Sequence, residues 1–281
     1  MSTFEQDGKG SSMTTDSAGK LRNATRIFRK LRTDWELLTV LTLRTWRSRG
    51  KGGIFSALWP ILTPLFLLVV YYCAFGLVLN LRNNVGNVNY ALFMFSGMTL
   101  FNVFTESLTV GAYSIISQSG YVRNASFDLE VLPLTAVGCA FLTGLCWLAV
   151  VLAAAGCAGT LGVRLLWLPP VLIPFGLFCI GVALFSGAIS VYLRDFPQFA
   201  VLIQQGLFFL APIVYPADVI PEQYRPWLLL NPLTGYVEAF RAALFGLQVE
   251  RIGLLWVIGI AVCLAGWIFF RSTRKGFIDA I

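Results

Sequence analysis

The chain has 281 residues, of which 57% are hydrophobic and only 12% are charged. A soluble domain carries about twice that charged fraction, so the composition excludes an ordinary soluble protein and indicates one integral membrane domain. The net charge of +7 does not indicate nucleic-acid binding, because six of the seven charges lie within residues 1–53, beside the first apolar segment.

The first 53 residues are expected to lie outside the membrane. Residues 1–20 are rich in Ser, Thr, Gly and Lys, which predicts a disordered tail, and they lack the apolar core of a signal peptide. Residues 21–53 place Ile27, Leu31 and Trp35 on one helical face and arginines on others, the pattern of an amphipathic interface segment on the cytoplasmic leaflet. A soluble helix packed on another protein is the alternative.

Residues 54–281 are expected to form the membrane domain. Six apolar segments are long enough to cross a bilayer: 54–79, 90–117, 134–161, 171–193, 196–215 and 252–270. Six crossings place both termini on one side, where sixteen Lys and Arg residues gather against five on the other, so both termini are expected in the cytoplasm. The predicted fold is all-α, with six transmembrane helices, an N-terminal amphipathic interface helix, and short re-entrant helices between spans five and six.

The connection between spans two and three, residues 118–133, has the features of a surface that a partner can bind. Ser126 and the residues after it fit a helix-capping pattern, and Tyr121, Phe127 and Leu129 would give a short helix an apolar face. An ordinary connector is the alternative. The residues expected to contact a cytoplasmic partner are Tyr121, Arg123, Asn124, Phe127, Asp128 and Glu130.

Residues 215–246 are interrupted by four prolines, and their second half predicts a helix. Asn231 is expected as its N-cap, Pro232 as its first residue and Gly246 as its end. Such a helix is about 20 Å long, shorter than the ~30 Å hydrocarbon core. The segment is therefore expected to enter the membrane edge and return, as an outer gate or as a decorated extracellular loop. The candidate gate residues are Tyr215, Tyr224, Trp227, Tyr236, Glu238, Phe240 and Arg241, with Glu238 and Arg241 expected to pair.

Few residues offer chemistry. The chain has no histidine and no CxxC pair, and no phosphate-binding loop, so no catalytic or metal site is expected and any ATPase must be another chain. Glu106 is the one acid well inside an apolar segment, too little for an ion-coupled carrier or a membrane enzyme, and a helix–helix hydrogen bond is its alternative role. The candidate channel-lining residues are Tyr71, Tyr72, Phe75, Phe104 and Glu106. The candidate phosphate-binding residues are Arg44, Arg47, Arg49 and Lys51.

Four segments together resemble a known family, the type-2 ABC exporter permeases for lipid-linked polysaccharides such as capsule, O-antigen or teichoic acid. They are Leu43–Gly76, a basic helix before a Trp/Pro-containing span; Tyr90–Leu134, with its Phe-Ser-Gly and Thr-Glu-Ser; Tyr192–Gly246, with Arg-Asp and Asn-Pro-Leu-Thr-Gly; and the C-terminal Phe277–Ile281. Each segment alone is weak, and their order and spacing make the resemblance specific.

The resemblance implies a membrane subunit that couples transport to ATP rather than performing chemistry. It implies a homodimer in the cytoplasmic (inner) membrane with two ABC ATPase subunits, which carry ATP and Mg, and a lipid-linked glycan as substrate. It makes residues 118–133 the coupling helix, residues 215–246 the outer gate, and periplasmic or outer-membrane export proteins further partners. The alternatives are an ABC exporter of a drug or small lipid, an ion-coupled secondary transporter, and a membrane glycosyl or acyl transferase.

Overall fold

The computed structural model describes residues 35–49, 58–74, 88–118, 128–216, 220–224, 228, 231–247 and 251–280. The elements formed by these residues are helices, which confirms the all-α class. Four are long and apolar enough to cross a bilayer. These are α3 (Tyr90–Tyr113), α5 (Val131–Cys157), α6 (Leu168–Tyr192) and α10 (Ile252–Thr273).

Two of the expected spans appear as shorter apolar helices, α2 (Trp59–Tyr71) and α7 (Phe196–Leu210). The segment expected to be helical over 196–215 stops at Leu210, because Ala211 precedes Pro212 and adopts an extended conformation with φ −96° and ψ 145°. A residue before proline is disfavoured in the helical region. At 15 residues α7 is about 22 Å long, so the count of six spans stays a prediction.

The remaining elements are short. Helix α9 (Pro232–Phe245) has the predicted ends: the Asn231 side chain accepts a hydrogen bond from Leu233 N, Pro232 is its first residue, and Gly246 has φ +75°. Glycine adopts this left-handed conformation without steric cost. The other short elements are η2 (Ile116–Gln118), η3 (Val163–Trp167), η5 (Glu222–Tyr224), η6 (Arg274–Gly276) and α11 (Phe277–Ala280).

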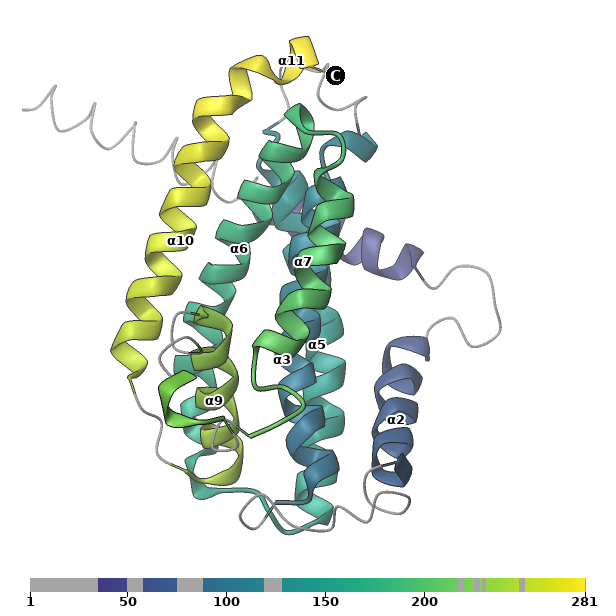
Figure 1. Ribbon diagram of the computed structural model, residues 1–281. Helices are drawn as coiled ribbons and strands as arrows, with labels where there is room; N and C mark the ends of the chain where they lie inside the picture. Colours follow the sequence, from purple (N-terminus) through teal and green to yellow (C-terminus); the bar gives the residue numbers. More distant parts are fainter. Residues whose placement is uncertain are drawn as a thin grey trace, which may run out of the picture.

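Helix α3 lies at the centre of the bundle, and 89% of its most apolar window is buried inside the chain. It contacts α5, α6, α7 and α9. Helices α3, α6 and α10 end at the end of the bundle where α11 lies, and α5 and α7 begin there, whereas α2 lies beside the other half of the bundle (Figure 1). The buried aromatic and aliphatic side chains of α3 form the main core with those of α5, α6 and α9.

Helix α10 runs along α6 at very close range. A Cβ added at Gly181 of α6 would collide with the Val262 carbonyl group, and one added at Gly266 of α10 would collide with the Gly181 carbonyl group. Small residues allow this close backbone approach, the usual means of packing helices in lipid.

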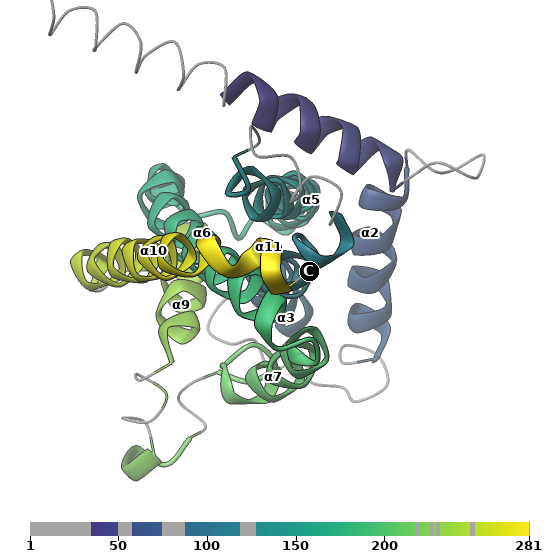
Figure 2. The ribbon, with the colours of Figure 1, turned by 90° about the horizontal axis from the view of Figure 1, so that it is seen from above.

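The helix over residues 35–48 lies across the bundle, passing α5 and reaching α2 (Figure 2). Its buried Thr42 meets α5 at Gly138 and Cys139, where the Cys139 Sγ lies 3.5 Å from the Thr42 carbonyl oxygen. This contact holds the end of the helix, with Arg47 and Arg49, beside the bundle. Most of the interface segment expected over residues 21–53 lies outside the described residues.

Candidate functional site: a pocket between the N-terminal helix and α3

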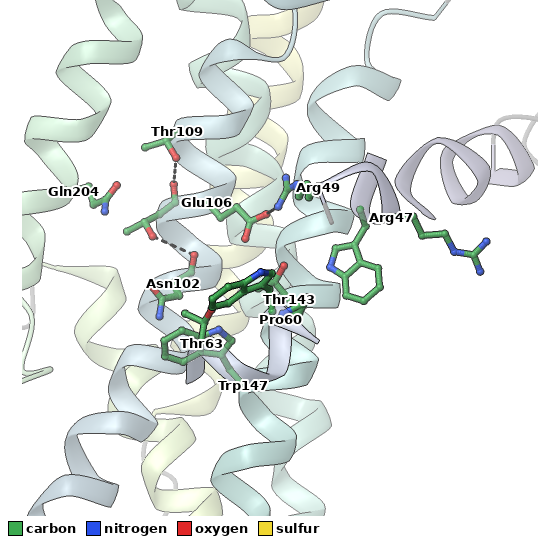
Figure 3. Close-up of a pocket in the computed structure, with 13 residues that line it drawn as sticks. Arg47, Arg49, Pro60, Thr63, Asn102, Glu106, Thr109, Thr143, Trp147 and Gln204 are labelled. Atoms are coloured by element: carbon green, nitrogen blue, oxygen red, sulfur yellow. Dashed lines mark hydrogen bonds and ion pairs between the residues drawn. The ribbon is translucent and has the colours of Figure 1, made fainter. Parts of the chain in front are cut away.

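A cavity of about 580 Å³ opens between residues 46–49, α2, α3, α5 and α7 (Figure 3). Its lining combines tryptophans, hydroxyl and amide side chains and three charged residues. The lining residues are Trp46, Arg47, Arg49, Trp59, Pro60, Thr63, Asn102, Thr105, Glu106, Thr109, Thr143, Trp147 and Gln204.

The polar wall of this pocket comes from one face of α3. Thr105 and Glu106 lie three and four residues after Asn102, and Thr109 lies four and three residues after them, so all four residues fall on one side of the helix. The Thr105 hydroxyl donates to the Asn102 carbonyl at 3.1 Å, and the Thr109 hydroxyl donates to the Thr105 carbonyl at 2.7 Å. Asn102 Nδ2 is shielded from solvent and has no hydrogen-bond partner among the described residues.

Arg49 reaches into the pocket from the opposite side and forms an ion pair with Glu106 (Figure 3). The Glu106 side chain is 17% exposed and the Arg49 side chain 37%. The sequence placed these two residues in separate groups, one for phosphate binding and one for channel lining, and the structure brings them together. Arg47 also lines the pocket, although its side chain points away from Glu106 in Figure 3.

Of the other two phosphate-binding candidates, the described residues include only Arg44. Arg44 is exposed and does not line the cavity, and Lys51 lies outside the described residues. Their role stays a prediction.

Three tryptophans supply the aromatic surface of the pocket, and sequence reasoning missed all of them. Trp46 lies between Arg44 and Arg47 in the chain, Trp59 begins α2, and Trp147 lies on α5 stacked on Phe95 with ring centroids 5.1 Å apart. Trp46 lies beside arginines and Trp59 lies near the start of the first apolar segment, a signal that could have found them. Trp147 lies in the middle of the apolar segment 134–161 and carries no such signal.

The aromatic channel candidates occupy other places. Phe104 is 5% exposed and stacks on Phe178 within the bundle, and Tyr71 packs against the core. Tyr72 is exposed, and Phe75 lies outside the described residues. None of the three described residues lines the pocket, and their part in a channel stays a prediction.

Three of the gate candidates are buried inside a single chain. Tyr236 and Phe240 have no exposed surface, and the Tyr236 hydroxyl donates to the Leu255 carbonyl at 2.7 Å. Arg241 is 4% exposed. Their side chains therefore do not reach the surface in this conformation, and a gate would need α9 to move or to act through other residues.

The remaining gate candidates lie nearer the surface. Tyr224 and Glu238 are exposed, the Tyr215 hydroxyl donates to the Phe209 carbonyl at 2.7 Å, and Trp227 lies outside the described residues. The gate itself stays a prediction.

Arg241 is held by backbone carbonyl groups from two other parts of the chain. Its Nη1 donates to Pro212 O at 2.5 Å, and its Nη2 donates to Ile213 O at 2.9 Å and Phe93 O at 3.1 Å. The guanidinium also lies 3.6 Å from the centroid of the Phe93 ring. Burial lowers the pKa of Arg241 to about 9, while the charge of the exposed Glu238 acts in the opposite direction. These carbonyl bonds, more than a surface pair with Glu238, account for its position.

Two residues of the expected partner-binding segment are ion-paired to the C-terminal end of the chain. Arg271 Nε lies 3.0 Å from Glu130 Oε1, and Arg274 Nη2 lies 3.4 Å from Asp128 Oδ1. Leu129, between the two acids, is buried in a cluster that contains residues of α10 and α11. The sequence counted Arg271 and Arg274 among the basic residues that set the membrane topology, and it did not pair them with these two acids. The other four candidates, Tyr121, Arg123, Asn124 and Phe127, lie outside the described residues.

Comparison with known proteins shows the family to which this chain belongs. The sequence model of the ABC-2 type transporter family matches residues 36–245, three quarters of the chain. The chain belongs to the ABC-2 type transporter family. The match includes the residues that line the pocket, Arg241 and all of α9, and it confirms the family resemblance expected from the sequence.

Named relatives cover nearly the whole of this ABC-2 transporter. An O-antigen export system permease protein RfbA from Klebsiella pneumoniae is 27% identical over 252 residues, covering 88% of this chain and 95% of its own. The RfbA protein of Myxococcus xanthus is 27% identical over 265 residues, covering 91% and 99%. The polysialic acid transport protein KpsM of Escherichia coli is 22% identical over 260 residues, covering 85% and 94%.

Proposed function

We propose that this ABC-2 transporter is the permease subunit of an ATP-driven exporter that moves a lipid-linked polysaccharide across the cytoplasmic membrane. The observation that carries the proposal is the nearly full-length match to permeases that are themselves named for O-antigen or polysialic acid. The shared class of cargo favours a polysaccharide over a drug or small lipid, and the family favours ATP over an ion gradient as the energy source.

The chemistry of the pocket supports this proposal. A glycan presents ring faces that stack on aromatic side chains and hydroxyl groups that need hydrogen-bond partners, and its lipid linkage carries phosphate. The pocket offers Trp46, Trp59 and Trp147 for the first, Asn102 and Gln204 for the second, and arginines for the third.

The partners follow from the same proposal. Two copies of the chain would assemble with two ABC ATPase subunits, which bind ATP and Mg, and with periplasmic or outer-membrane export proteins. The expected contact with the ATPase is residues 118–133. Two of its described residues, Asp128 and Glu130, are ion-paired to Arg274 and Arg271 at the end of the bundle where the C-terminal helix α11 lies (Figure 1), which supports a cytoplasmic position for this end.

The test is reconstitution of the permease with its ATPase in liposomes that contain a lipid-linked glycan. We expect ATP to move the glycan to the opposite leaflet, where a lectin detects it. Trp59→Ala should lower this rate by about tenfold, because an aromatic surface lost from a binding site costs about 1–2 kcal/mol. Trp35→Ala is the matched control, since Trp35 is 66% exposed and does not line the pocket.

Two results would contradict the proposal. Transport of a small lipid or drug with no transport of the glycan would favour the other class of exporter. Movement of the glycan under an ion gradient, without ATP, would favour a secondary transporter.

A further inference from the structure

The Arg49–Glu106 ion pair joins a carboxylate of the apolar helix α3 to an arginine from the end of the N-terminal helix. A carboxylate within an apolar helix is costly, by about 2.5–3.5 kcal/mol on insertion scales, and is normally kept for function. Arg49 is the one partner that the described structure gives to the Glu106 carboxylate. The pair is neither fully buried nor on the outer surface: it forms part of the pocket wall (Figure 3).

The neighbouring hydroxyl groups of α3 do not donate hydrogen bonds to Glu106, so Arg49 is its partner among the described residues. Thr105 and Thr109, the hydroxyl groups nearest on α3, donate to carbonyl groups of α3 itself. Their protons are therefore not directed at the carboxylate. Arg49 projects from outside the bundle, from the end of the helix over residues 35–48, and has the five donors that match carboxylate and phosphate oxygens alike.

We propose that Glu106 occupies the place on Arg49 that an anionic group of the transported ligand takes, so that loading the pocket exchanges one ion pair for another. This rests on the proposed function and deepens it, because the anion is the phosphate of a lipid-linked glycan. In the empty pocket Glu106 satisfies Arg49 and holds the N-terminal helix against α3. A phosphate group bound to Arg49 displaces the carboxylate and breaks that link between helix and bundle.

The exchange explains how the pocket selects charged ligands. The pocket lining carries Arg47, Arg49 and Glu106, a net charge of +1. A neutral lipid forms no ion pair with Arg49, so the Arg49–Glu106 pair stays intact. An anionic ligand gains the guanidinium in exchange for one partly exposed ion pair.

The experiment measures binding rather than transport. The purified complex of the permease with its ATPase is titrated with farnesyl diphosphate, with inorganic diphosphate and with farnesol, and binding is followed by tryptophan fluorescence. Glu106→Gln should tighten the binding of farnesyl diphosphate by about fivefold, the order expected when one competing ion pair is removed. Arg49→Gln should weaken it by about tenfold. The gain from Glu106→Gln should disappear when Arg49 is also Gln, and it should shrink in high salt.

The probes separate the sources of phosphate. Tight binding of inorganic diphosphate would indicate a site for free phosphate, and binding of farnesol alone would indicate a lipid site without charge selection; either result overturns the proposal. Arg49→Lys, which keeps the charge, serves as the variant of choice if Arg49→Gln fails to assemble, and it should bind more weakly than the native chain.

A structural role for the ion pair predicts the opposite sign. If Glu106 only pins the helix in place, Glu106→Gln should loosen the pocket and weaken binding, or leave it unchanged, and the proposal is wrong. If Glu106→Gln binds farnesyl diphosphate no more tightly than the native chain does, while the native chain exports the glycan normally, the exchange is refuted and the proposed function stands. Export failure of the native chain would refute the proposed function itself.

Discussion

Replacing Arg241 by methionine tests whether the buried guanidinium holds α9 in place. Methionine keeps a similar length but cannot donate a hydrogen bond. The change removes the hydrogen-bond donor of the carbonyl groups of Pro212 and Ile213, which lie in the non-helical turn after α7. Each buried acceptor left without a partner costs about 1–3 kcal/mol. Relief from burying a charge acts in the other direction, so we expect a net loss of about 2–4 kcal/mol.

The loss appears in thermal unfolding of the purified permease in detergent. For a chain of this size 1 kcal/mol shifts the Tm by about 2–4 °C, so Arg241→Met should lower it by about 4–16 °C. Arg241→Lys should fall between, because one ammonium group cannot reach all three carbonyl groups. Arg194→Met, at an exposed arginine in the turn between α6 and α7, is the matched control and should change the Tm little.

A second variant identifies the cause of the shift. A Cβ at Gly97 would collide with Arg241 Nη2, so Gly97→Ala should destabilise the native chain and do less harm once Arg241 is Met. An unchanged Tm in Arg241→Met, or equal damage from Gly97→Ala in both backgrounds, would show that the guanidinium does not hold this junction.

Two further predictions concern the C-terminal half of the chain. Arg271→Glu should lower ATP-driven transport in liposomes by up to about fivefold, because the pair with Glu130 is 58% exposed on its arginine side and worth about 0.2–1 kcal/mol. Adding Glu130→Arg should restore it, and Lys275→Glu should have little effect; no rescue would exclude a role for the pair. Gly181→Ala should lower the Tm by an amount equivalent to about 1–3 kcal/mol, because its Cβ meets the α10 backbone. Gly253→Ala, with open space around it, should leave the Tm unchanged or raised, and equal effects would refute close packing as the cause.

The parts of the fold that follow from local chemistry were predictable from the sequence. The ends of α9 depend on Asn231, Pro232 and Gly246, each of which acts on the backbone within a few residues of itself. The long apolar helices likewise need only their own composition. The end of α7 at Leu210 also depends on neighbouring residues, because Pro212 disfavours a helical conformation at Ala211. It was missed because the apolar segment continues beyond it to residue 215.

The parts that depend on distant contacts were not predictable. Arg49 and Glu106 are 57 positions apart, and no spacing rule joins them. Arg241 was expected to pair with Glu238, because the two residues are three positions apart on one helix. Its actual environment is made by carbonyl groups of α3 and of the turn after α7, which the pattern of α9 does not contain.

Helix α3 connects three regions of the chain: the contact with Arg241, the pocket, and the cluster around Leu129. Phe93 near its start accepts from Arg241, Glu106 in its middle forms the pocket wall, and Ile115 just beyond its end packs in the cluster that buries Leu129 of the expected coupling segment. An α-helix keeps about 1.5 Å per residue and resists compression, and α3 is the most enclosed of the long helices. It is therefore the fixed frame of the chain. The elements around the pocket that pack on it less extensively are α2 and α7, together with the residues that carry Arg49. We therefore expect any opening of the pocket to come from those elements, and the Arg49–Glu106 pair lies at the point where one of them meets α3.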